Sequence, residues 1–204
     1  MLPFNREQSL CANLNDLLAN IFNLPARDSF SNLNVEAILR LKVALASMNN
    51  LLTLKVTIAF VNWLAERLHF DQQVKRELEE KTQNSKPNTN GFDVWIQFPT
   101  AVVAEVKCNV PINKGARYST SQQNGINADI RNLLNGKRKA KADPKQCLKF
   151  MAFLDIPQIR DANKELLRSS SICKDRLVFL DNKEAIHRLD VVHGVYVWPA
   201  ASLT

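Results

Sequence analysis

Glycine is scarce in this sequence, with 5 residues in a chain of 204. A fold with many tight β-turns needs glycine at positive φ angles, so the shortage argues against an all-β protein. The 4 cysteines do not stand at zinc-binding spacings from one another or from a histidine. We expect buried free thiols in a reducing cytoplasm at Cys11, Cys108, Cys147 and Cys173.

Histidine chemistry and membrane-spanning segments are not expected either. The 3 histidines have no partner at a catalytic or metal-binding spacing: they are His69, His187 and His193. The most apolar stretch, residues 51–64, is interrupted by Lys55 and Asn62 and is short for a membrane span. The N-terminus does not resemble a signal peptide. The sequence therefore predicts a soluble cytoplasmic protein with no membrane partner and no organic cofactor.

The chain is basic, with a formal net charge of +7 and a pI of about 9.4. Its 46% of hydrophobic and 23% of charged residues are ordinary for a soluble globular protein. A basic balance favours an acidic partner, and nucleic acid is the commonest one. A basic protein with no polyanionic ligand is the alternative, and charge alone does not separate the two.

Apolar positions recur at helical spacing up to about residue 80. This pattern predicts helices at residues 35–48, 51–68 and 72–81, and Asn34 is expected to cap the first of them. Residues 82–91 are polar and contain proline and glycine, which is typical of a loop. The N-terminal part of the chain is therefore expected to be helical.

Runs of β-branched and aromatic residues follow this loop and alternate with helical patterns. Strands are predicted at residues 92–98, 101–108, 148–154, 177–180 and 195–198. Helices are predicted at residues 121–134, 159–168 and 183–188. This order predicts an α/β (α+β) fold in which a central mixed β-sheet is flanked by helices, with a helical N-terminal region.

The first two predicted strands are separated by a short turn around Pro99. If the hairpin is centred there, Asp93 and Glu105 face each other, because each stands six positions from Pro99. Lys107 follows two positions after Glu105 and so points to the same face. Two opposed carboxylates repel each other and should destabilise the hairpin. A divalent cation between them removes that repulsion.

Oxygen ligands at this spacing suit Mg²⁺, for which Mn²⁺ is the expected substitute. The ion can polarise a phosphodiester and lower the pKa of a bound water, while Lys107 can orient that water or stabilise the developing charge. An ordinary solvated edge strand would also carry such charges. The apolar neighbours Val103 and Val106 indicate instead a buried strand, in which charges need partners.

The sequence Gly91-Phe-Asp93, an eleven-residue gap and then Glu105-Val-Lys107 resembles the motif of the PD-(D/E)XK nuclease superfamily. The usual proline before the first acid is Phe92 here, at a position that varies widely in the superfamily. The order of elements over residues 51–199 is also similar, with a helix, the hairpin, a second helix and a further strand.

This resemblance implies a restriction-endonuclease-like core over residues 51–204, with residues 1–50 serving dimerisation or DNA gripping. It also implies that Asp93 and Glu105 bind the metal together with the backbone carbonyl of Val106, and that Lys107 serves the attacking water. Such nucleases often take a further acid from the preceding helix, for which Glu66 is the best candidate. An exposed helix acid is the ordinary alternative for Glu66.

Two further groups of polar residues are candidate DNA contacts. The loop and helix after the motif could line the cleft with Asn109, Lys114, Gln122 and Gln123. The main basic run could neutralise phosphates with Arg131, Lys137, Arg138, Lys139 and Lys141. The alternative for both groups is a solvated loop and helix end, where cations are favoured anyway.

The sequence therefore predicts a magnesium-dependent endonuclease that hydrolyses double-stranded DNA, similar to small type II restriction enzymes. Cutting both strands requires two sites, so we expect a homodimer. The alternatives are a nuclease of the same superfamily in DNA repair, junction resolution or phage defence, and a catalytically silent DNA-binding module of the same fold. The recognition sequence and the choice between one and two metals do not follow from the sequence.

Overall fold

The computed structural model describes residues 11–12, 15–16, 19–20, 34–85, 91–111, 117–138, 140, 142–181 and 186–199. The chain divides into two compact units, Met1–Asn49 and Asn50–Thr204. The functions predicted for the parts before and after residue 50 stay predictions.

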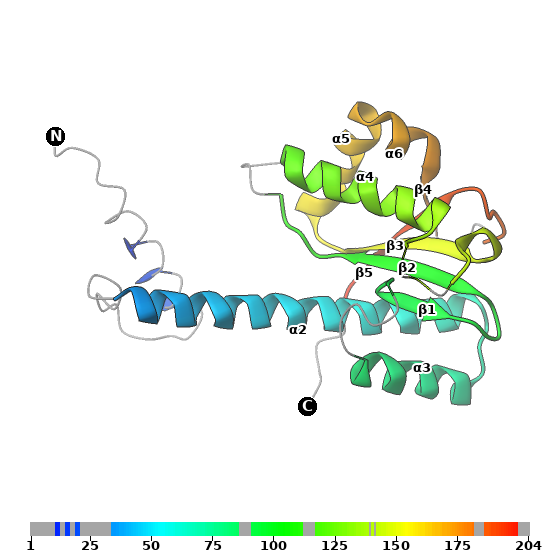
Figure 1. Cartoon of the computed structure of the whole chain (residues 1–204), viewed down its shortest axis with the longest axis horizontal. Coiled ribbons are helices and arrows are strands. Elements are labelled where there is room, and N and C mark those ends of the chain that lie inside the picture. Colours follow the sequence, from blue (N-terminus) through cyan, green and yellow to red (C-terminus); the bar gives the residue numbers. More distant parts are fainter. Residues whose placement is uncertain are drawn as a thin grey trace. The chain divides into compact units, whose positions relative to one another are not determined.

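A five-stranded sheet forms the centre of the second unit, with the strand order β1-β2-β3-β5-β4. The strands are β1 (Val94–Ile96), β2 (Val102–Lys107), β3 (Leu148–Leu154), β4 (Leu177–Phe179) and β5 (Val192–Val197). The pair β1 and β2 is antiparallel, and the other neighbours are parallel. The predicted α/β fold with a mixed sheet is thus confirmed (Figure 1).

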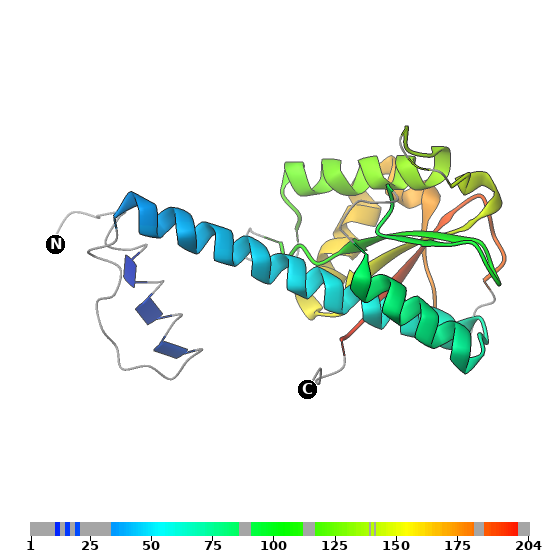
Figure 2. The ribbon, with the colours of Figure 1, turned by 60° about the horizontal axis from the view of Figure 1, so that its bottom comes forward.

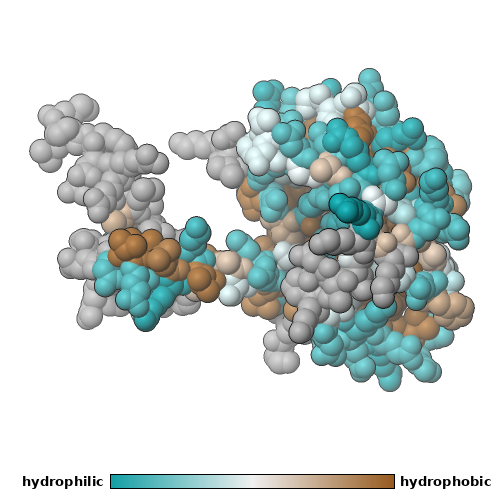
Figure 3. Space-filling model, in the orientation of Figure 1, coloured by the Kyte–Doolittle hydropathy of each residue, from teal (hydrophilic) through white to brown (hydrophobic). Residues whose placement is uncertain are grey.

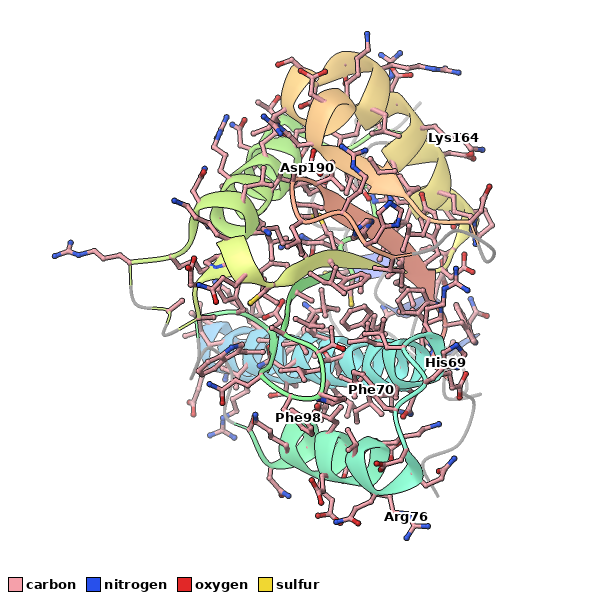
Figure 4. All side chains as sticks on the ribbon, turned by 90° about the vertical axis from the view of Figure 1, so that its right-hand side faces the viewer. His69, Phe70, Arg76, Phe98, Lys164 and Asp190 are labelled. Atoms are coloured by element: carbon pink, nitrogen blue, oxygen red, sulfur yellow. The ribbon has the colours of Figure 1, made fainter. Side chains whose placement is uncertain are left out.

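Helices cover both faces of this sheet (Figures 1 and 2). One face carries α4 (Thr120–Asn135), α5 (Pro157–Ser169) and α6 (Ser171–Arg176), and the other carries α3 (Gln72–Asn84) and the second-unit part of α2 (Val35–Arg67). Phe60 of α2 packs on Phe150 of β3, with ring centroids 5.6 Å apart. Figure 4 shows His69 and Phe70 where α2 ends and the chain turns into α3.

The prediction of two helices before residue 68 was wrong, because α2 is one helix of 33 residues. Asn49 and Asn50 join the two predicted segments, and asparagine weakens a helix without breaking it as proline does. Asn34 does cap the helix, since its Oδ1 accepts a hydrogen bond of 2.9 Å from the backbone N–H of Ala37.

By length and composition, α2 could cross a membrane, with a mean hydropathy of 1.4 over its most apolar window. The apolar stretch at residues 51–64 is part of this longer helix, and core helices of soluble proteins meet the same criteria. Figure 3 shows apolar residues at the surface along its N-terminal part, where the exposed ones include Val35, Ile38, Leu39, Val43, Leu45 and Met48. Cytoplasmic localisation and dimerisation stay predictions.

Several element boundaries differ from the predicted ones. The hairpin strands are shorter than expected, and β5 begins at Val192, ahead of the predicted residue 195. The helix α3 continues through Asn84 into the predicted loop, and α6 was not predicted. Residues 186–188 are not helical, and residues 182–185 of that predicted helix lie outside the described residues. The predicted strand at residues 148–154 matches β3.

Candidate active site

The register of the β1–β2 hairpin is the one that a turn at Pro99 predicts. Val94 pairs with Ala104, and Ile96 pairs with Val102. Continued by one residue, this register sets Asp93 across from Glu105. Asp93 lies immediately before β1, and its Oδ2 accepts a hydrogen bond of 2.8 Å from the backbone N–H of Val106. The first acid is therefore fixed to the strand that carries the second acid and the lysine.

The alternation of side chains along β2 places Glu105 and Lys107 on the sheet face beneath α4. Lys107 forms an ion pair with Asp129, which lies on α4. Ala104 points to the opposite face, where its partner in the register is Phe150, which packs on Phe60 and Trp63 of α2. The acids and the lysine of the motif thus face one helix, while α2 covers the other side.

Glu105 is buried, with 4% of its surface exposed. Its Oε1 accepts a hydrogen bond of 2.6 Å from the Nζ of Lys137. Burial and the nearby charge of Asp93 raise the pKa of Glu105 to about 7, although Lys137 opposes this shift. Glu105 is therefore a carboxylate that needs more positive charge around it than the protein supplies.

Asp129 and Lys137 are charged partners of the motif that were not predicted from the sequence. Asp129 pairs with Lys107, and each side chain keeps 19% of its surface exposed. Asp129 stands between the buried residues Ile126 and Ile130 of α4. A carboxylate within an otherwise apolar helix face is the sequence signal that could have identified it. Lys137 was predicted as a DNA contact, and its side chain instead reaches Glu105 and lies 5.0 Å from the ring centroid of Phe92.

The described residues contain no group of three or more histidine, cysteine, aspartate or glutamate side chains that could hold a metal ion. The expected ligand set has two carboxylates, Asp93 and Glu105, and one backbone carbonyl, that of Val106. In a strand the N–H and C=O of one residue point to the same side, and the N–H of Val106 points to Asp93. Because β1 pairs with β2 only as far as Ala104, the carbonyl of Val106 lies beyond the β1–β2 ladder. These oxygen ligands and the buried carboxylate of Glu105 fit a hard divalent cation.

Glu66 does not join this site. Its side chain is 72% exposed and forms an ion pair of 3.1 Å with Lys75 of α3. It lies near the end of α2, the helix that covers the sheet face opposite Glu105. The ordinary alternative for Glu66, an exposed helix acid, agrees with this placement.

The glutamines after the motif bind the protein's own backbone. Gln122 forms a capping box with Ser119 at the start of α4, and its Nε2 donates to the carbonyl of Val110 at 3.0 Å. Gln123 donates to the carbonyl of Tyr118 at 2.9 Å. A phosphate contact by either amide would require these bonds to break. Asn109 is exposed just after β2, where a ligand could reach it.

The predicted basic residues do not act as one group. Arg131 and Arg138 are exposed, whereas Lys137 is paired with Glu105. The other three predicted contacts, Lys114, Lys139 and Lys141, lie outside the described residues. Their contribution to DNA binding stays a prediction.

Comparisons with protein-family models, with curated protein sequences and with solved structures find no match for this chain. The support for a function therefore comes from the charges, burial and geometry of the site and from the sequence motif.

Proposed function

We propose that this protein is a metal-dependent nuclease that hydrolyses phosphodiester bonds of double-stranded DNA through Asp93, Glu105 and Lys107. The observation that carries the proposal is the buried Glu105, which shares a sheet face with Lys107 and lies across the hairpin from Asp93. A fold without such chemistry gains little from burying a carboxylate beside another acid. The resemblance to the PD-(D/E)XK nucleases supports the same assignment.

Each residue has a separate task in this proposal. Asp93, Glu105 and the carbonyl of Val106 would hold Mg²⁺, for which Mn²⁺ could substitute. The bound ion would polarise the phosphodiester and favour ionisation of water at neutral pH. Lys107 orients the attacking water and stabilises the charge that develops on the phosphoryl oxygens. Asp129 positions Lys107 through their ion pair.

Lys137 holds Glu105 through its hydrogen bond, and a bound metal would compete with Lys137 for this carboxylate. Its ammonium supplies positive charge to a carboxylate that burial and Asp93 push toward protonation. Among the described residues of the site, the acids Asp93, Glu105 and Asp129 outnumber the two lysines by one charge when Glu105 is ionised, which attracts a divalent cation.

The net charge of +7 supports DNA as the substrate, because a basic surface concentrates polyanions. Cleavage of both strands by one kind of site requires a second copy, so we propose a homodimer. A type II restriction enzyme is the favoured version of this function. A repair, junction-resolving or defence nuclease would use the same site, and a silent DNA-binding module would have no use for the Asp93, Glu105 and Lys107 set.

The test is incubation of unmethylated plasmid DNA of diverse sequence with the full chain, with Mg²⁺, Mn²⁺ or EDTA. Cleavage should require a metal. Lys107→Ala should cut about a hundredfold to a thousandfold more slowly while it still binds DNA. Lys174→Ala is the control, because Lys174 is exposed on α6 and outside the site. Normal cutting by Lys107→Ala, or no metal-dependent cutting at all, would refute the proposal.

The ends of the products separate the versions of this function. A mixed DNA library is cut with Mg²⁺, and the fragment ends are sequenced. A single short sequence at the ends supports restriction, whereas cutting at branched or damaged sites supports the repair or junction-resolving alternative.

A further inference from the structure

We propose that a second site, a basic cavity beside α4, binds the phosphate group of a nucleotide. The cavity has a volume of about 440 Å³, which is within the usual range for small-molecule sites. It lies between α4, α6, the start of β3 and the segment before β5. Its lining residues with polar side chains are Arg131, Asn135, Lys145, Lys149, Arg176 and Asp190. This site goes beyond the proposed nuclease and does not rest on it.

The charge of the cavity is strongly unbalanced. Among the described residues, four cations line it and Asp190 is the one acid. Asp190 is already engaged, since its Oδ2 lies 2.7 Å from a guanidinium nitrogen of Arg188, which is outside the lining. Within the part of the chain that the structure describes, none of the four cations of the lining forms an ion pair with a carboxylate. An anion would supply the missing charge.

Lys149 provides a buried, hydrogen-bonded ammonium in the wall of the cavity. It is 1% exposed, and its Nζ donates hydrogen bonds to the backbone carbonyls of Cys147 at 2.9 Å and Leu189 at 2.7 Å. An ammonium has three donors, and no described residue accepts the third. Burial lowers the pKa of this ammonium, so an anion in the cavity would stabilise its charged form.

The shape and donors of the cavity favour a phosphate ester. Arg131 and Arg176 present planar guanidinium groups, which suit the oxygens of a phosphate, and Lys145 adds a flexible ammonium. Apolar side chains of Leu134, Ile172 and Leu189 form other parts of the wall. Such a mixture of cations and apolar surface fits a nucleotide, with its phosphate at the cations and its base or sugar on the apolar side.

The test is a calorimetric titration of the full chain in EDTA. One titration uses inorganic phosphate and a separate one uses dAMP. EDTA keeps the metal site out of the measurement, so failure of the nuclease proposal does not affect the result. Lys145→Gln should weaken binding of either probe at least about tenfold. Lys174→Gln is the matched control, because it removes the same charge from an exposed α6 lysine outside the cavity. Both side chains are exposed, so both variants should fold.

Arg131→Gln provides a second test from another element, and it should weaken binding by a similar factor. Equal binding by Lys145→Gln and Lys174→Gln, or no binding of either probe at millimolar concentration, would overturn the proposal. A third titration, with duplex DNA at several salt concentrations, identifies the source of the phosphate. If the nucleotide belongs to a DNA strand, Lys145→Gln reduces the salt dependence of DNA binding by about one phosphate contact. If only dAMP binding weakens, the ligand is a free nucleotide.

Discussion

The Nζ of Lys137 lies 2.6 Å from Oε1 of Glu105, a residue that is 4% exposed. This pair joins the turn after α4 to β2 and supplies positive charge to Glu105. A metal ion bound at Glu105, as we propose, would compete with Lys137 for the same carboxylate. The competition is the basis of the first prediction.

Lys137→Met should tighten Mg²⁺ binding about tenfold, because the metal no longer displaces a charge-assisted hydrogen bond. Arg138→Met removes the same charge from the neighbouring exposed residue and should leave the affinity nearly unchanged. Calorimetric titration of both variants with Mg²⁺ gives the measurement. Equal or weaker binding by Lys137→Met would show that Lys137 does not compete with the metal.

Asp129→Asn should reduce the rate of DNA cleavage about tenfold to a hundredfold, because Lys107 loses the carboxylate that positions it. The double variant with Lys107→Ala should be no slower than Lys107→Ala alone, since Asp129 acts through Lys107. Asp161→Asn, on the exposed side of α5, is the control. Additive losses in the double variant would contradict the positioning role.

The stability of the metal-free protein should depend on the ionisation of Glu105. Its pKa is about 7 in the folded protein and 4.5 in an unperturbed side chain, so the folded protein holds the proton more tightly. The resulting stabilisation is complete below pH 4.5 and disappears as the pH rises through 7. It amounts to about 3 kcal/mol.

Urea denaturation in EDTA at several pH values between 4 and 8 measures this effect. Glu105→Gln mimics the protonated acid, so its stability should lack this decline and should exceed that of the wild type at pH 8. Comparison of the two proteins removes the contribution of other groups, such as His193, whose pKa is lowered by burial. If the free energy of unfolding changed with pH in the same way in both proteins, the raised pKa of Glu105 would be excluded.

Gln122→Ala should lower the free energy of unfolding by about 1 kcal/mol, because the capping box and the bond to Val110 are lost. DNA affinity should not change. Gln158→Ala is the control, since Gln158 is an exposed glutamine in the first turn of α5. Unchanged stability with weaker DNA binding would instead support the phosphate contact predicted from the sequence.

Gly194→Ala should destabilise the protein by about 1–3 kcal/mol, because the added Cβ would stand 2.7 Å from the ring of Phe179. Gly125→Ala is the matched control in α4, where nothing lies within 4 Å of an added Cβ. That change should stabilise the helix by about 0.5–1 kcal/mol. Thermal denaturation of both variants tests the packing of β5 against β4, and equal melting temperatures would contradict it.

The local pattern of the sequence was enough for the elements near the site. Pro99 and the flanking alternation gave the correct register, because pairing in a hairpin depends on the position of the turn and on which residues are apolar. The strand at residues 148–154 and the helix that ends before Gly136 were recognisable for the same reason. The continuity of α2 was missed because a boundary was placed at Asn49 and Asn50, which are exposed in the structure and weaken a helix without breaking it.

The sequence by itself therefore determined the mixed α/β fold and brought Asp93 opposite Glu105 beside Lys107. Only the tertiary structure decided which charges surround them. Asp129 and Lys137 come from α4 and the turn that follows it, and the crossing of this helix over the sheet brings them to Lys107 and Glu105. Glu66 is excluded because its helix covers the opposite face. Strand periodicity predicts which side chains share a face of the sheet. The packing of helices on that face determines the partners of these side chains, and hence their burial and pKa.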